Sequence, residues 1–257
     1  MDLALHRLQV LLPADEFVLL AVILAMPLLG AFVNGVFGRR LGDQAVSLMG
    51  ITSVAASFVG SVVAFVLLTA AAPAVGHGGG PTAFDWHGWE WLTLTGRGGA
   101  PVPVEVAFSL DALSATMALV VTGVGLLIHV YSTKYMEGDP GYYRFFSYLN
   151  LFIFSMLVLV FGANLPMLFI GWEGVGLCSY LLIGFWFEDR AAAAAGKKAF
   201  ITNRIGDFGL LVAMAMLVYY VGSLDFGGNE AARGQLLQDF VYWPLGSRMS
   251  WLDWMGE

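Results

Sequence analysis

Long apolar runs alternate with short polar segments along most of this chain. Each run is about as long as the roughly 20 residues that a helix needs to cross a membrane. Six runs are predicted to be membrane-spanning helices, with approximate bounds 17–37, 45–71, 108–131, 145–161, 164–186 and 200–221. We therefore expect an all-α polytopic membrane protein with about six transmembrane helices.

A different pattern separates the second span from the third. Residues 72–105 are rich in Gly, Pro and Trp, and the strings WEWLTLT and PVPVEVAF alternate apolar and polar positions around the turn residues GRGGA. Such alternation on both sides of a Gly-rich turn is typical of a β-hairpin. Because Trp is enriched at membrane–water interfaces, we expect a short hairpin that lies on the membrane surface, on the outer side of the membrane.

These patterns divide the chain into four parts. Residues 1–71 hold the first two spans, 72–105 form the outer loop, 106–221 hold spans three to six, and 222–257 are a polar, amphipathic outer tail. Only GANL connects spans four and five, so these helices should lie side by side and antiparallel. The fifth span ends at FEDR, and the five alanines and GKK after it are expected to form a cytoplasmic connection.

The distribution of basic residues predicts the orientation, because Lys and Arg are retained on the cytoplasmic side. With the N-terminus outside, eight basic residues fall on the cytoplasmic side and four on the outer side. The cytoplasmic set comprises Arg39, Arg40, Lys134, Arg144, Arg190, Lys197, Lys198 and Arg204. The outer set comprises Arg7, Arg97, Arg233 and Arg248. Both termini are thus predicted to lie outside.

Composition supports a membrane protein and excludes several kinds of site. Hydrophobic residues make up 58% of the chain and charged residues only 12%, against about 25% charged residues in soluble domains. No basic run indicates nucleic-acid binding. The single cysteine, Cys178, lies in a span and can form neither an intrachain disulfide nor a thiolate metal cluster. The histidines, at positions 6, 77, 87 and 129, have no ligand spacing. We interpret His77 and His87 as solvated loop residues, with metal binding as the alternative.

Three ionisable side chains fall inside predicted spans: Glu173 in the fifth, and Arg204 and Asp207 in the sixth. A charge at the bilayer centre costs about 2.5–3.5 kcal/mol on insertion scales, so such residues indicate an ion or proton path. Glu173 lies roughly eight residues, or about 12 Å, into its span. Burial favours a protonated carboxyl group and a nearby cation favours the ionised form. A movable cation beside Glu173 would therefore make it load and release a proton.

The other candidates have alternative interpretations. Arg204 and Asp207 are three residues apart and share a helix face, so they form a structural ion pair or, alternatively, Asp207 tunes Glu173 or a neighbouring lysine. Asp111 precedes helical sequence, where it is expected to cap the third helix, with a transport role as the alternative. His129, near the end of that helix and wet headgroups, is a candidate for proton transfer because unperturbed histidine titrates near neutrality.

Three strings carry a resemblance to a known family: FSLDALSATMALVVTGVGLLIHVYSTKYMEGDPGYYRFFSYLNLFIFSMLVLV, LFIGWEGVGLCSYLLIGFW and KKAFITNRIGDFGLL. They resemble the L subunits of bacterial NADH–quinone oxidoreductase, respiratory complex I, whose mitochondrial counterpart is the fifth ND subunit. The resemblance is strong from about Phe108 to Leu211. It implies a proton-translocating membrane subunit in the bacterial inner membrane, with both termini in the periplasm.

The same resemblance implies a division of labour within a complex. NADH, FMN, iron–sulfur clusters and quinone would bind to other subunits, and this chain would hold no cofactor. Its partners would be other membrane subunits, especially the adjacent antiporter-like subunit, and the lipid bilayer. Glu173 would be the proton-path carboxylate paired with a lysine on a seventh helix, and Arg204 and Asp207 would belong to its polar network. Asp111 and His129 match recurring positions of the third helix.

Members of that family are much longer than this chain. The chain is therefore expected to stop before the seventh helix and its lysine, as a truncated product or as the N-terminal part of a longer protein. In that case Glu173 would lack its expected cation partner. Two alternatives stay open: a subunit of an Mrp-type cation/proton antiporter, whose large subunit shares the Trp-Glu helix, and an inert assembly fragment.

Overall fold

Six long helices account for most of the described chain. The structure, a computed structural model, describes residues 18–71 and 84–226. The helices are α2 (Val18–Leu41), α3 (Asp43–Ala71), α4 (Ala112–Tyr135), α5 (Tyr142–Phe161), α6 (Leu165–Ile183) and α7 (Arg190–Tyr220). All six are long and apolar enough to cross a membrane, which confirms the predicted fold class.

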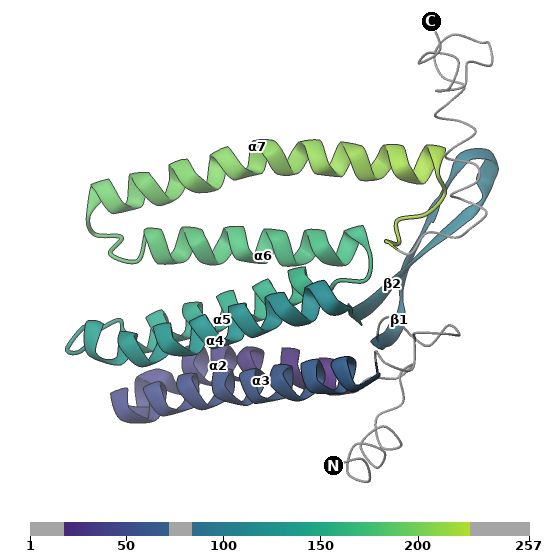
Figure 1. Ribbon diagram of the computed structural model, residues 1–257. Coiled ribbons are helices and arrows are strands. Elements are labelled where there is room, and N and C mark those ends of the chain that lie inside the picture. The colour runs from purple at the N-terminus through teal and green to yellow at the C-terminus, as the bar shows by residue number, and fades with distance from the viewer. Residues whose placement is uncertain (1–17, 72–83, 227–257) are drawn as a thin grey trace, which may run out of the picture.

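The helices run side by side, with the hairpin across one end and short connections at the other (Figure 1). Helices α2, α3, α4 and α5 pack into one group. Helix α6 packs against α5, and α7 packs against α6. The antiparallel pairing of α5 and α6 that the GANL connection predicts is confirmed. The α6–α7 pair, which carries the three predicted intramembrane charges, forms the edge of the described bundle.

Small residues on α6 set its distance from α5. A Cβ atom on Gly171 would lie 2.3 Å from the backbone nitrogen of Leu159, and one on Gly174 would lie 2.5 Å from Oγ of Ser155. Because no side chain fits at either position, the two helices can approach closely, as in many membrane interfaces. This packing commits one face of α6 to α5 and leaves Glu173 free to reach toward α7.

The predicted hairpin is present, and it is longer than expected. Strand β1 (Phe84–Thr95) pairs antiparallel with β2 (Pro101–Leu110), from Phe84 opposite Leu110 to Thr95 opposite Pro101. The turn contains Gly98 and Gly99 at φ 75° and 84°, backbone angles that glycine adopts without strain. The predicted boundaries at residues 105 and 108 are therefore wrong. Residues 106–110 continue the strand pattern and pair with β1 instead of starting a helix.

Asp111 lies between strand β2, which ends at Leu110, and helix α4, which begins at Ala112. Its side chain accepts a hydrogen bond of 2.7 Å from the backbone N–H of Ser114, and its own N–H donates at 2.8 Å to Oγ of Ser114. This reciprocal arrangement is a capping box, which satisfies two backbone donors that the helix leaves free. The prediction that Asp111 caps the third helix is thus confirmed.

The prediction that the five alanines and GKK form a connection is wrong. Helix α7 begins at Arg190 and includes them. Asp189 caps this helix by accepting a hydrogen bond of 2.8 Å from the N–H of Ala191. Alanine has the highest helix propensity of all residues, so a polar segment of this composition extends the membrane helix past its apolar part.

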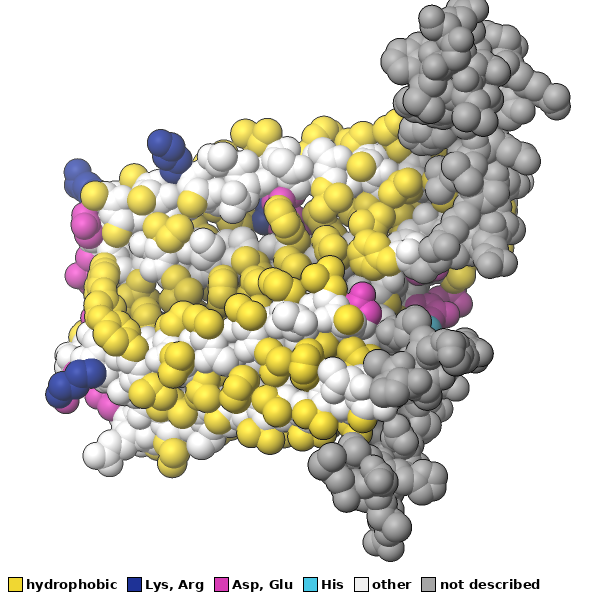
Figure 2. Space-filling view, viewed as in Figure 1, with side chains coloured by type: hydrophobic (Ala, Val, Ile, Leu, Met, Phe, Trp, Pro, Cys, Tyr) yellow, Lys and Arg dark blue, Asp and Glu magenta, His cyan; other side chains and the backbone are white. Residues whose placement is uncertain are grey.

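Side-chain character matches a membrane environment. Apolar side chains cover most of the visible helix surface, and Lys and Arg gather mainly at the end with the α2–α3, α4–α5 and α6–α7 connections (Figure 2). A small charged group lies apart from them, near the middle of the α6–α7 region (Figure 2). Of the six spans, α6 and α7 are the least buried within the described chain. Their outer faces are therefore available to lipid or to other protein segments.

Candidate functional site

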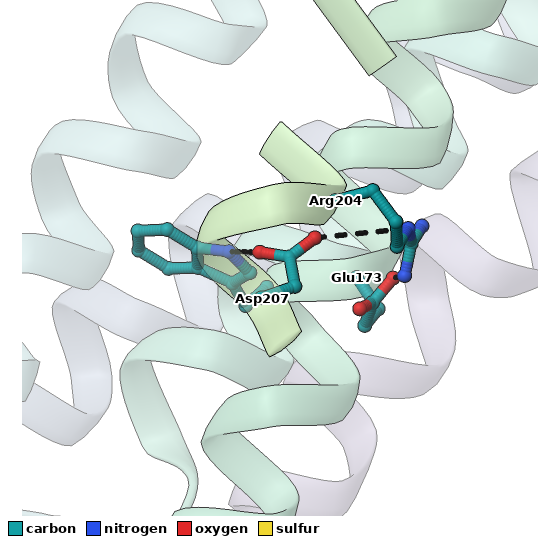
Figure 3. Close-up of polar contacts among 4 residues, drawn as sticks. Glu173, Arg204 and Asp207 are labelled. Atoms are coloured by element: carbon teal, nitrogen blue, oxygen red, sulfur yellow. Dashed lines mark hydrogen bonds and ion pairs between the residues drawn. The ribbon is translucent and has the colours of Figure 1, made fainter. Parts of the chain in front are cut away.

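Glu173, Arg204 and Asp207 meet between α6 and α7 (Figure 3). Nη1 of Arg204 donates a hydrogen bond to Oε2 of Glu173, which is the ion pair that joins the two helices. Nε of Arg204 lies 3.8 Å from Oδ2 of Asp207 on its own helix. The guanidinium group thus lies between two carboxyl groups, one from each helix.

The resemblance implies a lysine on a seventh helix as the partner of Glu173 and places Arg204 in the surrounding polar network. In this structure Arg204 is the cation that contacts Glu173 directly. Sequence reasoning missed the pair because the two residues are 31 positions apart and lie on different helices. The predicted proximity of Arg204 and Asp207 on one helix face is confirmed, so the ion pair and the Glu173 contact exist together.

Asp207 is held by a further residue that sequence reasoning did not select. The indole N–H of Trp172 donates a hydrogen bond of 2.7 Å to Oδ1 of Asp207. Only 5% of the Asp207 side chain is exposed, against 21% for Glu173 and 45% for Arg204. The signal was present as the Trp-Glu dipeptide, in which the tryptophan brings a polar N–H to the helix position next to the glutamate.

The cluster lies near the middle of both helices, where charges have to be paired. Glu173 is central in α6 (Leu165–Ile183), and Arg204 and Asp207 are central in α7 (Arg190–Tyr220). The guanidinium carbon of Arg204 also lies 4.6 Å from the ring centroid of Phe200. An aromatic face attracts a cation at this distance. Paired groups of this kind avoid most of the cost of isolated charges in hydrocarbon.

One cation between two carboxyl groups allows a proton to be exchanged. With both carboxyl groups ionised the three side chains carry a net charge of −1, which a low-dielectric environment disfavours. One guanidinium group cannot neutralise both carboxyl groups, so the cluster can take up one proton without gaining a net positive charge.

His129 lies elsewhere, within the α2–α5 group. It is fully buried, its Nδ1 is 2.8 Å from the carbonyl oxygen of Gly125, and its ring meets Phe146 edge-on at a centroid distance of 6.0 Å. The side chain is therefore shielded by the helix bundle, because α4 turns this position toward α5. Its Nε2 has no hydrogen-bond partner among the described residues.

The remaining candidates are placed as follows. His87 lies on β1 rather than in a loop, exposed, with Nδ1 3.2 Å from Oε2 of Glu105. His77 falls outside the described residues, and Cys178 is buried in α6. In residues 18–71 and 84–226, no group of three or more His, Cys, Asp or Glu side chains could hold a metal ion.

Two family models match this chain. The model described as "NADH-Ubiquinone oxidoreductase (complex I), chain 5 N-terminus" matches residues 98–146, which include β2, α4 and the start of α5. The model described as "NADH:quinone oxidoreductase/Mrp antiporter, TM" matches residues 162–239. The second match contains Trp172, Glu173, Arg204 and Asp207, so the whole cluster falls within a segment that these proteins share.

Several curated relatives are similar over most of the chain. The NADH-quinone oxidoreductase subunit L of Neisseria meningitidis (serogroup A) is 41% identical over 214 residues, which is 82% of this chain and 30% of the relative. The subunit L of Escherichia coli K12 is 42% identical over 209 residues, covering 81% and 32%. The subunit L of Mycobacterium tuberculosis is 42% identical over 207 residues, covering 80% and 31%. The chain spans about 30% of the length of these relatives.

Two solved membrane complexes contain chains of similar fold. The archaeal membrane-bound sulfane sulfur reductase superposes with a TM-score of 0.58 at 19% identity, covering 80% of this chain and 38% of that one. The Mrp complex from Dietzia sp. superposes with a TM-score of 0.57 at 21% identity, covering 84% and 22%. These two structures share the fold of this chain, and the family models and curated relatives show that its sequence is similar to NADH–quinone oxidoreductase L subunits and their chain 5 counterparts.

Proposed function

We propose that this chain is part of a proton-translocating membrane subunit of NADH–quinone oxidoreductase. In this proposal Glu173 loads and releases the proton, Arg204 is its exchangeable cation, and Asp207 is the second partner of that cation. The observation that carries the proposal is the pairing of two carboxyl groups with one arginine at the middle of two membrane-spanning helices. The relatives named NADH-quinone oxidoreductase subunit L support the assignment to this complex.

The proposed cycle has two arrangements. In the first, Arg204 neutralises Glu173 and the site carries no exchangeable proton. In the second, Arg204 lies against Asp207, and Glu173 binds a proton from one side of the membrane. Return of Arg204 then displaces that proton toward the other side. In this proposal NADH, FMN, iron–sulfur clusters and quinone bind to other subunits. Redox chemistry there supplies the energy that moves Arg204 and changes the side of the membrane from which Glu173 is accessible.

The proposal also assigns an orientation and partners. The end with the α2–α3, α4–α5 and α6–α7 connections faces the cytoplasm of a bacterial cell, because the basic side chains gather there (Figure 2). The hairpin and both termini then face the periplasm. The least buried spans, α6 and α7, face further membrane segments of the complex, including those of the adjacent antiporter-like subunit.

His129 is proposed as a second proton-transfer group, because its Nε2 is buried and has no hydrogen-bond partner among the described residues.

A specific observation also supports a second candidate function, that of an Mrp-type cation/proton antiporter subunit. The matching transmembrane model is shared with Mrp antiporters, and the Mrp complex of Dietzia sp. has a similar fold. Inverted membrane vesicles that contain the whole complex separate the two functions. Complex I function predicts NADH-driven proton uptake that needs this chain, and no exchange driven by a sodium gradient without NADH. Sodium-driven proton exchange in the absence of NADH would favour the antiporter instead.

We expect Asp207→Asn to reduce NADH-driven proton uptake by about two- to fivefold while the complex still assembles. The amide keeps an oxygen for the Trp172 N–H, yet it removes the charge that attracts Arg204 away from Glu173, an effect of about 0.5–1 kcal/mol for partly shielded pairs. Proton uptake in vesicles and the amount of assembled complex measure the two effects. Loss of assembly would show that the Arg204–Asp207 ion pair is chiefly structural.

A further inference from the structure

A polar cavity of about 410 Å³ lies at the end of the helices that carries the α2–α3 and α4–α5 connections. Ligand cavities in proteins begin at about 300 Å³. Four charged side chains of the described residues line it: Arg39 and Asp43 at the α2–α3 corner, and Asp139 and Arg144 at the α4–α5 corner. Basic and acidic side chains lie side by side at this end of the molecule (Figure 2). The cavity therefore has the size and the charges to hold a small group that is itself charged.

The two arginines of the cavity have no carboxylate partner. Arg39 is exposed in the last turn of α2, and Arg144 is half-buried in the first turn of α5. Within the described chain neither forms an ion pair. The guanidinium carbon of Arg144 lies 5.7 Å and 5.4 Å from the ring centroids of Phe185 and Phe187, and such ring faces attract a cation without neutralising its charge. Two unneutralised guanidinium groups at one cavity favour the binding of a phosphate group.

The two carboxyl groups of the cavity differ in their partners. Asp139 accepts a hydrogen bond of 2.6 Å from the backbone N–H of Gly141 and one of 3.0 Å from the indole N–H of Trp186. Asp43 is the exposed first residue of α3. Its carboxyl group forms neither an ion pair nor a hydrogen bond with the described residues. Asp43 is therefore the carboxyl group that can accept from a cation on a ligand.

The surface of α2 beside the cavity indicates that the ligand is a lipid. Leu29, Phe32 and Val36 are 49%, 59% and 57% exposed. Their spacing of three and four residues places them on one helix face, and Arg39 continues this spacing where the apolar span ends at Leu41. An acyl chain that lies along this face brings its headgroup to Arg39. A free phosphate would make no use of this apolar face.

We propose that this cavity binds the headgroup of a phospholipid that carries a primary ammonium group, of the phosphatidylethanolamine type. Arg39 and Arg144 donate hydrogen bonds to the phosphate, and Asp43 accepts from the ammonium group. The bound lipid joins the α2–α3 corner to the α4–α5 corner. Through Arg144 it also adjoins Phe185 and Phe187, which lie between α6 and α7. The site is separate from the charged cluster at the middle of α6 and α7.

The test is photo-labelling of the whole complex in a neutral detergent, with a trace of phosphatidylethanolamine that carries a diazirine in its acyl chain. Digestion and mass spectrometry locate the label, which we expect on the peptide that contains Leu29, Phe32 and Val36. Arg39→Gln should lower this labelling by about tenfold, as expected for one lost hydrogen bond between charged groups. Because Arg39 is exposed and makes no ion pair within the described chain, the variant should assemble as the wild type does.

Two further variants define the site. Arg190→Gln is the matched control, since Arg190 is exposed at the same end of the molecule and does not line the cavity. Its labelling should equal that of the wild type. Asp43→Asn should lower labelling by phosphatidylethanolamine by about threefold, as for one exposed ion pair, and should leave labelling by a matching phosphatidylglycerol unchanged.

Competition identifies the source of the phosphate. Unlabelled phosphatidylethanolamine should displace the label, and millimolar inorganic phosphate should not. Displacement by inorganic phosphate would show a site for free phosphate and overturn the assignment to a lipid. Equal labelling of Arg39→Gln and Arg190→Gln would overturn the site itself, and an Asp43→Asn complex that labels as the wild type would overturn the ammonium contact. Labelling that needs Arg39 and Asp43 but not Arg190 supports the proposal.

Discussion

Glu173→Gln is expected to lower NADH-driven proton uptake by at least tenfold while the complex stays assembled. The amide has nearly the shape of the carboxyl group and can still accept a hydrogen bond from Arg204, but it cannot bind and release a proton. Because the close α5–α6 contact at Gly171 and Gly174 does not involve this side chain, packing of α6 should persist. Coupled quinone reduction should fall in parallel.

The measurement compares proton uptake, quinone reduction and the amount of assembled complex in inverted vesicles. Glu188→Gln is a suitable control, since Glu188 is exposed in the connection between α6 and α7 and lies outside the cluster. That variant should behave as the wild type. Normal proton uptake in Glu173→Gln would remove Glu173 from the proton path, and with it the proposed function of the cluster.

Arg204→Leu is expected to reduce the amount of assembled complex severely and to abolish proton uptake in what remains. The substitution leaves two carboxyl groups without a cation, and each ionised group at this depth costs about 2.5–3.5 kcal/mol on insertion scales. Breaking a paired charge by removing one partner is more damaging than replacing the whole pair. Immunodetection of membrane-bound subunit and thermal stability in detergent measure the loss.

Two further variants show whether charge is the cause. Arg204→Lys keeps the cation and should assemble well, although a single ammonium group cannot reproduce the forked geometry of the guanidinium. The triple variant Arg204→Leu, Glu173→Gln, Asp207→Asn removes all three charges and should recover assembly without recovering proton uptake. Persistent failure of the triple variant to assemble would mean that the packing of Arg204, for example against Phe200, matters more than its charge.

The predictions from sequence succeeded where the controlling interactions are local. Asp111 directly precedes helical sequence, so its role as a helix cap could be expected from its position alone. The hairpin followed from alternation and a glycine turn in the same way. The end of β2 was missed because residues 106–110 are apolar enough for a span, and only their pairing with β1 shows that they are a strand.

The same limit explains the error about the start of α7 and the unforeseen burial of His129. Hydropathy predicts that the five alanines and the following GKK form a connection outside the membrane. The Asp189 cap and the high helix propensity of alanine instead extend α7 through them. His129 is close to the end of α4 in sequence, so it was expected near headgroups. Its burial against Phe146 depends on the rotation of α4 relative to α5, which no local pattern reveals.

The amino-acid sequence by itself indicated the six long apolar helices found among residues 18–71 and 84–226, and the three charged side chains within the last two of them. Sequence alone is enough to predict these helices, because a segment in hydrocarbon has to satisfy its own backbone hydrogen bonds. A long apolar run therefore becomes a helix. Only the tertiary structure decided that Arg204 pairs with Glu173 and that Trp172 holds Asp207. Those contacts depend on which faces of α6 and α7 meet. Close packing at Gly171 and Gly174 commits one face of α6 to α5 and leaves another face for α7.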